Sequence, residues 1–258
     1  MRNLITRTAA IVLAIAAPVL AAAQSSGRWV LTTTPGGQPQ IELQWPDRSQ
    51  WRRIVSETEL QGLAAGGDVA FRIDQDAGRF DFRGAVGDGE GTGTFHFSPN
   101  RSFATTMRSL GVTEMPEVTD RDLMNLAWGG VSARALREFR DLGYAPLTFR
   151  ETMEMAVHQV SPGYVRTLRS LGVRETSEVR GAVHARMFGV TPEYVRELAA
   201  VGVRGLSGKE LVGLRRHGVT PEFVRQLREA GRHDLSAETL REIRRAAREA
   251  ARRGRRGG

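Results

Sequence analysis

A short phrase recurs along the C-terminal part of the chain at nearly constant spacing. Its clearest copies begin at Ser161, Thr191 and Thr220, each followed at once by proline and, after one further residue, by an aromatic residue, valine and arginine. Degenerate copies begin at Asn100 and Ser132, so the intervals between starts are 32, 29, 30 and 29 residues. A fixed period of this size is typical of a stacked repeat array.

Each copy predicts two short helices. Thr191 is suited to cap a helix whose first residue is Pro192, and Gly202 supplies the left-handed residue that ends it. Ser207 begins a capping box for a second helix that stops at Gly218. Helices of about ten residues do not persist alone, so neighbouring copies must bury each other's apolar stripes.

We therefore expect an all-α solenoid of five two-helix repeats of about 30 residues over residues 99–251. The last helix carries only alanines as apolar residues after Arg244, which suits the end of an array. Residues 252–258 are expected to form a disordered basic tail.

Residues 24–98 predict a small antiparallel β domain, and the fold class is accordingly α+β. Apolar residues alternate there, as at Val69, Phe71 and Ile73, which is the pattern of a strand with one buried face. Glycine-rich stretches separate the runs and mark turns. We expect five or so strands, with one short helix that opens at the capping box Ser56–Glu59 and runs through Leu63.

Two features of this β domain invite a functional interpretation. Four phenylalanines share one face and form either core or an apolar pocket, with core the favoured interpretation: Phe80, Phe82, Phe95 and Phe97. Five acidic residues lie close together in sequence and suggest either a calcium site or solvated turns: Asp74, Asp76, Asp81, Asp88 and Glu90. We favour turns, because no calcium-binding loop motif is present.

The first residues predict export. Residues 1–23 combine a basic start, a short apolar run and small residues before Gln24, which is the pattern of a signal peptide cleaved near Ala23. Retention of the segment as an anchor is the alternative. No later stretch has the ~20 apolar residues that a membrane span requires, so we expect a periplasmic or secreted protein. Cysteine is absent from the sequence, which excludes disulfides and thiolate chemistry.

Two groups of arginines are candidate binding residues. Arg166, Arg196 and Arg225 recur once per repeat and either contact a partner or form a solvated face paired with carboxylates such as Glu197 or Glu229, which we favour. The formal charge of +8 lies mainly at the C-terminus. The candidate polyanion-binding residues there are Arg244, Arg245, Arg248, Arg252, Arg253, Arg255 and Arg256.

The sequence offers no catalytic or cofactor-binding motif, so we expect neither an enzyme nor a bound cofactor or metal. His158 and His217 occupy equivalent positions, but Phe188 stands between them in the repeat order, which argues against a row of metal ligands.

The phrase at Gly189–Leu198 and Gly218–Leu227 resembles uncharacterised repeats of bacterial envelope proteins. Similar repeats follow BlaR-type membrane metallopeptidases, often after a strand that ends like Phe95–Asn100. This chain has neither the membrane helices nor the zinc motif of those peptidases, so the resemblance implies a sensor or interaction module without proteolysis.

The preferred function is therefore a non-enzymatic scaffold that binds another envelope protein along its repeats. The alternative is binding of a polyanion, which is an anionic lipid, an envelope polymer or nucleic acid, through the Arg-rich C-terminal helix and tail. Export argues against nucleic acid as the partner. A small-molecule site between the β domain and the first repeats also stays open.

Overall fold

A computed structural model describes residues 25–34, 36–63, 66–174 and 178–254. They divide into two compact domains. The sheet domain contains residues up to 73 and residues 80–98, and the helical array contains residues 74–79 and those from 99 onward. The expected signal peptide and the last four residues of the expected tail lie outside the described residues.

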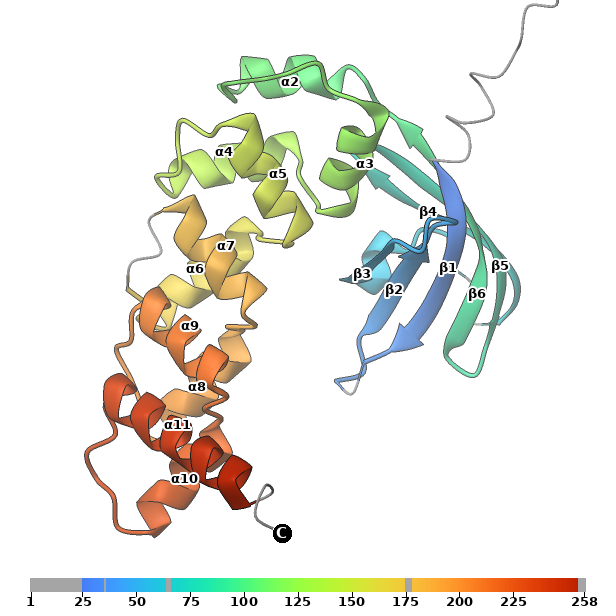
Figure 1. Ribbon diagram of the computed structural model, residues 1–258. Coiled ribbons are helices and arrows are strands. Elements are labelled where there is room, and N and C mark those ends of the chain that lie inside the picture. The colour runs from blue at the N-terminus through green and yellow to red at the C-terminus, as the bar shows by residue number, and fades with distance from the viewer. Residues whose placement is uncertain (1–24, 35, 64–65, 175–177, 255–258) are drawn as a thin grey trace, which may run out of the picture. The chain divides into compact units, whose positions relative to one another are not determined.

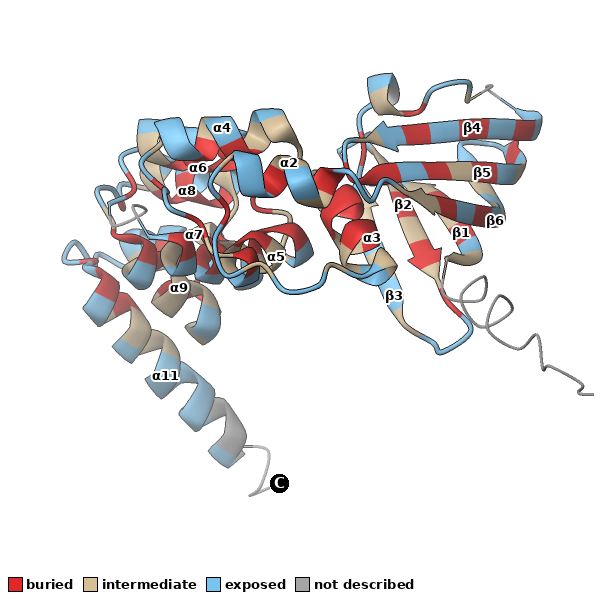
Figure 2. Cartoon of the chain, turned by 90° about the horizontal axis from the view of Figure 1, so that it is seen from above, coloured by how far each residue is buried: buried red, intermediate tan, exposed pale blue. Residues whose placement is uncertain are grey.

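The sheet domain is built on a single six-stranded antiparallel sheet with the strand order β3-β2-β1-β6-β5-β4 (Figure 1). Its strands are β1 (Ser26–Thr33), β2 (Pro39–Gln44), β3 (Gln50–Ile54), β4 (Gly67–Gln75), β5 (Gly78–Gly87) and β6 (Glu90–Pro99). Buried and exposed residues alternate along β4, β5 and β6 (Figure 2), so one face of the sheet forms the core.

The expectation of a small β segment was wrong, because the sheet is large and occupies residues 26–99. Buried residues also alternate in β1 and β2, at Trp29 and Leu31 and at Ile41 and Leu43, but not in β3. In β3 no residue is buried, since this strand lies at the edge of the sheet and Trp51 is only partly covered. An edge strand of this kind carries little of the apolar pattern by which strands are recognised.

The sheet curls strongly around Trp29. The ring of Trp29 in β1 lies 5.2 Å from that of Phe71 in β4, although two strands separate β1 from β4 in the sheet order. Neighbouring strands are about 4.8 Å apart, so a flat sheet would hold these residues much farther from each other. Trp29 Nε1 also donates to the carbonyl oxygen of Arg83 in β5 at 3.1 Å, reaching across β6.

Glycines in β6 make room for this indole. A Cβ on Gly91 would lie 2.9 Å from the Trp29 ring, and a Cβ on Gly93 would meet Trp29 Nε1 at 2.7 Å and the backbone of Gly84 at 2.7 Å. The absence of side chains at Gly91 and Gly93 therefore allows the Trp29 indole to pack closely against β5 and β6.

The four phenylalanines of the candidate pocket are buried core residues. Phe80 contacts Phe97 with ring centroids 4.7 Å apart, and Phe82 stacks on Phe71 at 4.5 Å. Asp76, from the acidic cluster, accepts a hydrogen bond from the backbone N–H of Ala133 at 2.7 Å, at the start of a helix in the array. A carboxylate there satisfies a free N–H group and meets the positive end of the helix dipole.

The helix predicted from Ser56 through Leu63 is only a single 3-10 turn, η1 (Glu57–Glu59). The capping contact itself is present, because the backbone N–H and hydroxyl of Ser56 both donate to Glu59. Gly62 adopts φ +90°, a left-handed conformation that ends the turn before a helix can grow.

Replacing Gly93 with alanine should destabilise the sheet domain by about 1–3 kcal/mol, because the new methyl group must displace backbone or the Trp29 indole. Gly87→Ala is the matched control, since nothing lies within 4 Å of a Cβ at that position. Urea unfolding followed by tryptophan fluorescence measures both. Equal stability of the two variants would contradict the packing described for Trp29.

The helical array consists of ten described helices, and all but the first and last have nine or ten residues. They are α2 (Phe103–Ser109), α3 (Asp120–Trp128), α4 (Ala133–Asp141), α5 (Phe149–Val157), α6 (Pro162–Ser170), α7 (Val179–Met187), α8 (Pro192–Ala200), α9 (Gly208–His217), α10 (Pro221–Glu229) and α11 (Ala237–Gly254). This agrees with the predicted helical character of the C-terminal part.

The helices form two layers (Figure 1). The first layer stacks α2, α4, α6, α8 and α10 in order, and the second stacks α3, α5, α7, α9 and α11 in order. We number the successive helix pairs 1 to 5, from α2–α3 to α10–α11. Each inner pair is thus covered on both sides by its neighbours, which buries apolar stripes that a lone pair would expose.

Local signals fix where the helices begin and end. The side chains of Thr191 and Thr220 accept the backbone N–H of the third helical residue, with proline at the first helical position. Ser207 forms a complete capping box with Glu210 before α9. Gly202 follows α8 with φ +85°, which lets the chain turn back at little steric cost.

Backbone hydrogen bonds also join neighbouring pairs. Arg174, after α6, donates its N–H to the carbonyl oxygen of Leu206 at 3.2 Å and accepts from Gly208 N–H at 2.9 Å. Thr113 makes the same two contacts with Leu147 and Phe149. These contacts link the loop of one pair to the start of the next pair's second helix.

The last helix exposes most of its C-terminal turns (Figure 2) and continues to Gly254, beyond the expected boundary at residue 251. Among the helices of the described residues, none combines the length and apolar character needed to cross a membrane.

Candidate binding surfaces of the helical array

The three candidate partner-binding arginines lie on first-layer helices, and each is half exposed. Arg166 Nη2 donates to Glu138 Oε2 in the preceding pair at 2.7 Å. Arg196 donates to Glu193 in its own helix at 3.1 Å, and Arg225 pairs with Glu222 in the same way. The structure thus pairs all three with carboxylates, and the partners are Glu138, Glu193 and Glu222 in place of the expected Glu197 or Glu229.

These ion pairs reduce what the three arginines offer to an anionic partner. Hydrogen bonds from Arg134 and then Arg166 hold the pKa of Glu138 below its ordinary value. The pKa of Glu193 is also lowered, chiefly by a backbone hydrogen bond at the start of α8 and in part by Arg196. Both carboxylates therefore stay charged near neutral pH. An anionic partner would have to compete with them for the guanidinium groups of Arg166 and Arg196.

The C-terminal arginines do not form one free cluster. Arg244 Nε donates to the carbonyl oxygen of Gly218 at 3.1 Å, and its guanidinium lies 4.7 Å from the centre of the Phe223 ring. The guanidinium of Arg248 lies directly against Gly218. Both side chains thus cover the end of α9, where a cation interacts favourably with the free carbonyl groups.

Of the other candidate polyanion-binding residues, Arg245 and Arg253 are exposed. Arg255 and Arg256 lie outside the described residues, as does the side chain of Arg252.

A different row of arginines organises the second layer, and the sequence analysis missed it. Arg186, Arg215 and Arg244 lie at the same position in α7, α9 and α11. Each guanidinium lies over the aromatic ring of its own pair, at 5.3 Å from Tyr164, 4.2 Å from Tyr194 and 4.7 Å from Phe223. Cation–π contacts of this kind stabilise partly buried sites.

The same aromatic residues and arginines also form hydrogen bonds to backbone carbonyl groups. The hydroxyl of Tyr194 donates to the carbonyl oxygen of Val219 at 2.9 Å, and burial raises the pKa of Tyr194 to about 12. Arg215 Nε donates to the carbonyl oxygen of Gly189 in the preceding pair at 2.7 Å. The regular spacing of aromatic residue and arginine in the sequence was the signal that could have revealed this arrangement.

The ends of the second-layer helices expose a row of apolar and basic side chains. Val157, Met187 and Phe188 are 59%, 48% and 36% exposed, although the helices that carry them are otherwise packed against their neighbours. Arg216 and Arg245 take the place of Met187 in the next two pairs, and Arg216 lies 5.5 Å from the Phe188 ring. We call these five residues the second-layer ridge.

The histidines give no indication of a metal centre. His217 Nδ1 lies 2.8 Å from the carbonyl oxygen of Gly213 in its own helix. Within the part of the chain that the structure describes, His, Asp and Glu residues do not gather in any group of three that could hold a metal ion.

Comparisons with family models, with curated proteins and with solved structures find no match to this chain. The resemblance to repeats of bacterial envelope proteins therefore stays a prediction from the repeated phrase alone.

Arg215→Ala should destabilise the array by about 1–2 kcal/mol, because it removes both the hydrogen bond to Gly189 and the cover on Tyr194. Arg216→Ala, one residue along and exposed, should change stability by less than about 0.5 kcal/mol. Thermal unfolding of the two variants, followed by circular dichroism, tests this prediction. Equal losses of stability in the two variants would mean that Arg215 does not link pair 4 to pair 3.

Acid should weaken the cap of α9. The backbone N–H of Ser207, and then its hydroxyl, hold the pKa of Glu210 below its ordinary value in the folded protein. The stability that Glu210 contributes is therefore present above its unfolded pKa of about 4.3 and is lost as the pH falls through the folded value.

Glu210→Gln should accordingly make the unfolding free energy less dependent on pH between about 5 and 3. Glu242→Gln, at an exposed position inside α11 and away from any helix cap, is the matched control for the loss of one carboxylate. Denaturant titrations at several pH values measure the slopes. A Glu210→Gln slope as steep as that of the wild type would contradict the capping role.

Proposed function

We propose that the protein is an exported, non-enzymatic scaffold that binds a protein partner on the second-layer ridge. The carrying observation is the exposure of Val157, Met187 and Phe188 at equivalent ends of neighbouring helices. Exposed apolar side chains gathered on one surface, bordered by polar groups, are typical of protein interaction sites. A stacked array suits this role because it presents an extended surface.

The chemistry of the ridge points to a partner segment with apolar residues at one end and carboxylates at the other. The ridge is apolar in pairs 2 and 3 and basic in pairs 4 and 5, where Arg216 and Arg245 stand. Packed helices lie about 8–10 Å apart, so the ridge from α5 to α11 extends over roughly 27 Å. About eight residues of an extended segment would cover it.

The first-layer arginines support partner binding less well, because Arg166, Arg196 and Arg225 already pair with carboxylates of the array. Polyanion binding through the C-terminus is also weaker as a proposal. Arg244 and Arg248 cover the end of α9 and are not free for a ligand. Export and a periplasmic or secreted location belong to the same proposal, which makes another envelope protein the expected partner.

The test is crosslinking of the tagged protein in an envelope fraction of the producing cell, with quantitative identification of what is captured. The variant Met187→Glu with Phe188→Glu should lose a partner that the wild type captures, because two carboxylates replace the exposed apolar surface. Arg166→Glu with Arg196→Glu is the control with two new carboxylates on the first layer, and it should retain the partner.

The reverse pattern would reject the ridge and favour the first-layer arginines. Capture of the same proteins by all three forms would reject both surfaces. Circular dichroism of each variant establishes that the array is folded before the capture is interpreted.

A further inference from the structure

One position of the first-layer helices departs from the pattern of its equivalents. Arg108, Arg140, Arg169 and Arg228 occupy this position in α2, α4, α6 and α10, whereas α8 has Ala199. Arg169 shows what the arginine does, because its Nη1 donates to the carbonyl oxygen of Leu142 at the end of the preceding first-layer helix, at 2.9 Å. The guanidinium of Arg228 likewise lies against Gly202, after α8.

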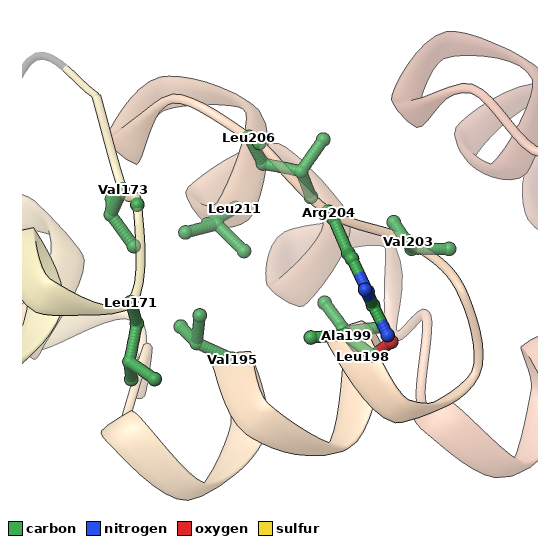
Figure 3. A pocket seen from close by; sticks show the side chains of 11 residues that line it. Leu171, Val173, Val195, Leu198, Ala199, Val203, Arg204, Leu206 and Leu211 are labelled. Carbon is green, nitrogen blue, oxygen red and sulfur yellow. The ribbon is translucent and has the colours of Figure 1, made fainter.

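Alanine at position 199 cannot reach the end of α6, and a cavity of about 240 Å³ lies there instead. Leu171 and Val173, from the end of α6, lie opposite Val195 and Ala199 of α8 (Figure 3). Leu206 and Leu211 close the far side. The walls are therefore formed almost entirely by aliphatic side chains.

The equivalent place between pairs 1 and 2 shows that this cavity depends on residue size. Arg140 and Tyr144 stand there where Ala199 and Val203 stand between pairs 3 and 4, and the remaining space is about 20 Å³. The backbone arrangement is shared, since Thr113 and Arg174 make the same loop contacts. Val195 is likewise shorter than the equivalent Leu136, so three shorter side chains accompany the larger cavity.

Among the described residues that line this apolar space, one is a cation. Arg204 donates from Nε to the carbonyl oxygen of Ala199 at 3.0 Å, and its guanidinium extends along one wall toward Ala199 (Figure 3). The side chain is exposed, and its terminal nitrogens carry further N–H groups. A guanidinium next to aliphatic walls is suited to hold a carboxylate whose apolar body fills the space behind it.

We propose that this cavity binds a small apolar carboxylate, with Arg204 holding the carboxylate group and the leucine and valine walls holding the apolar body. A cavity of roughly 150 Å³ can hold benzene, so 240 Å³ suits a ligand of about ten non-hydrogen atoms. Simple aromatic or aliphatic acids and the C-terminal residue of a peptide share this chemistry. The site uses none of the ridge residues and so stands or falls independently of the proposed scaffold function.

The experiment measures binding to the full chain by calorimetry and by thermal shift, with phenylacetate, phenylacetamide and phenethylamine as probes of similar shape. Phenylacetate should bind saturably and raise Tm. The neutral amide should bind roughly tenfold more weakly, because it lacks the charge-assisted hydrogen bond to Arg204. Stronger binding of the amine would overturn the proposal, since it would mean that the carbonyl end of α6 recruits a cation.

Acetyl-Gly-Leu and its C-terminal amide distinguish the two sources of carboxylate. Binding of the free peptide acid but not of phenylacetate would narrow the ligand to a peptide C-terminus. Failure of every acid to bind would overturn the proposal.

Ala199→Arg is the decisive variant, because it gives pair 4 the side chain that the four other pairs already carry. It should abolish phenylacetate binding while Tm stays at or above that of the wild type. Ala200→Arg adds the same arginine one residue along, outside the cavity lining, and should bind phenylacetate normally.

Arg204→Gln should weaken phenylacetate but leave phenylacetamide unchanged. Ala199→Leu fills the space without adding charge and should also abolish binding, which keeps the test valid if the arginine variant folds poorly. Unaltered phenylacetate binding in the Ala199 variants would overturn the proposal.

Discussion

Stacking between successive helix pairs is the interaction on which the whole array depends. The inner helices have only nine or ten residues, and helices of that length are marginal in water even with favourable sequences. Their stability must come from apolar stripes buried against the next pair. The loop contacts of Thr113 and Arg174 add backbone hydrogen bonds to this burial and fix the register of one pair on another.

Neighbouring helices of the second layer contact each other in two different ways. Between pairs 1 and 2 the contact is close and uses small residues, since a Cβ on Gly129 would collide with the backbone of Ala156. From pair 3 onward an arginine replaces that alanine, and Arg215 and Arg244 bridge the gap to the carbonyl groups of Gly189 and Gly218. Packing therefore gives way to charge-assisted hydrogen bonds along the array.

Helix positions could be predicted because caps and stops are local signals. Thr191, Pro192 and Gly202 mark a helix from residues that lie next to one another, whatever the partner helices do. The sheet was underestimated because the strand pattern depends on burial, which is slight at the edge strand β3. The capping box at Ser56 was recognised, but Gly62 ended the helix within one turn.

The candidate sites were harder to predict, because recurrence reveals architecture more readily than function. Arg166, Arg196 and Arg225 were identified from their regular spacing, yet which carboxylate each would meet depends on side-chain reach in three dimensions. The cavity beside Ala199 arises where the pattern fails. Only the structure shows that a missing arginine leaves space, because neighbouring side chains could equally have filled it.

The arginine hydrogen bonds between second-layer helices also affect how such an array can gain or lose repeats. Pair 4 offers the Gly218 carbonyl to the arginine that follows and carries Arg215 for the glycine carbonyl that precedes it. A tandem duplication of residues 191–219 would therefore supply matching donors and acceptors at both new junctions. Insertion between pairs 1 and 2 would have to re-establish a close steric fit. The C-terminal half is thus the part of the gene in which copy number can drift with least structural disturbance.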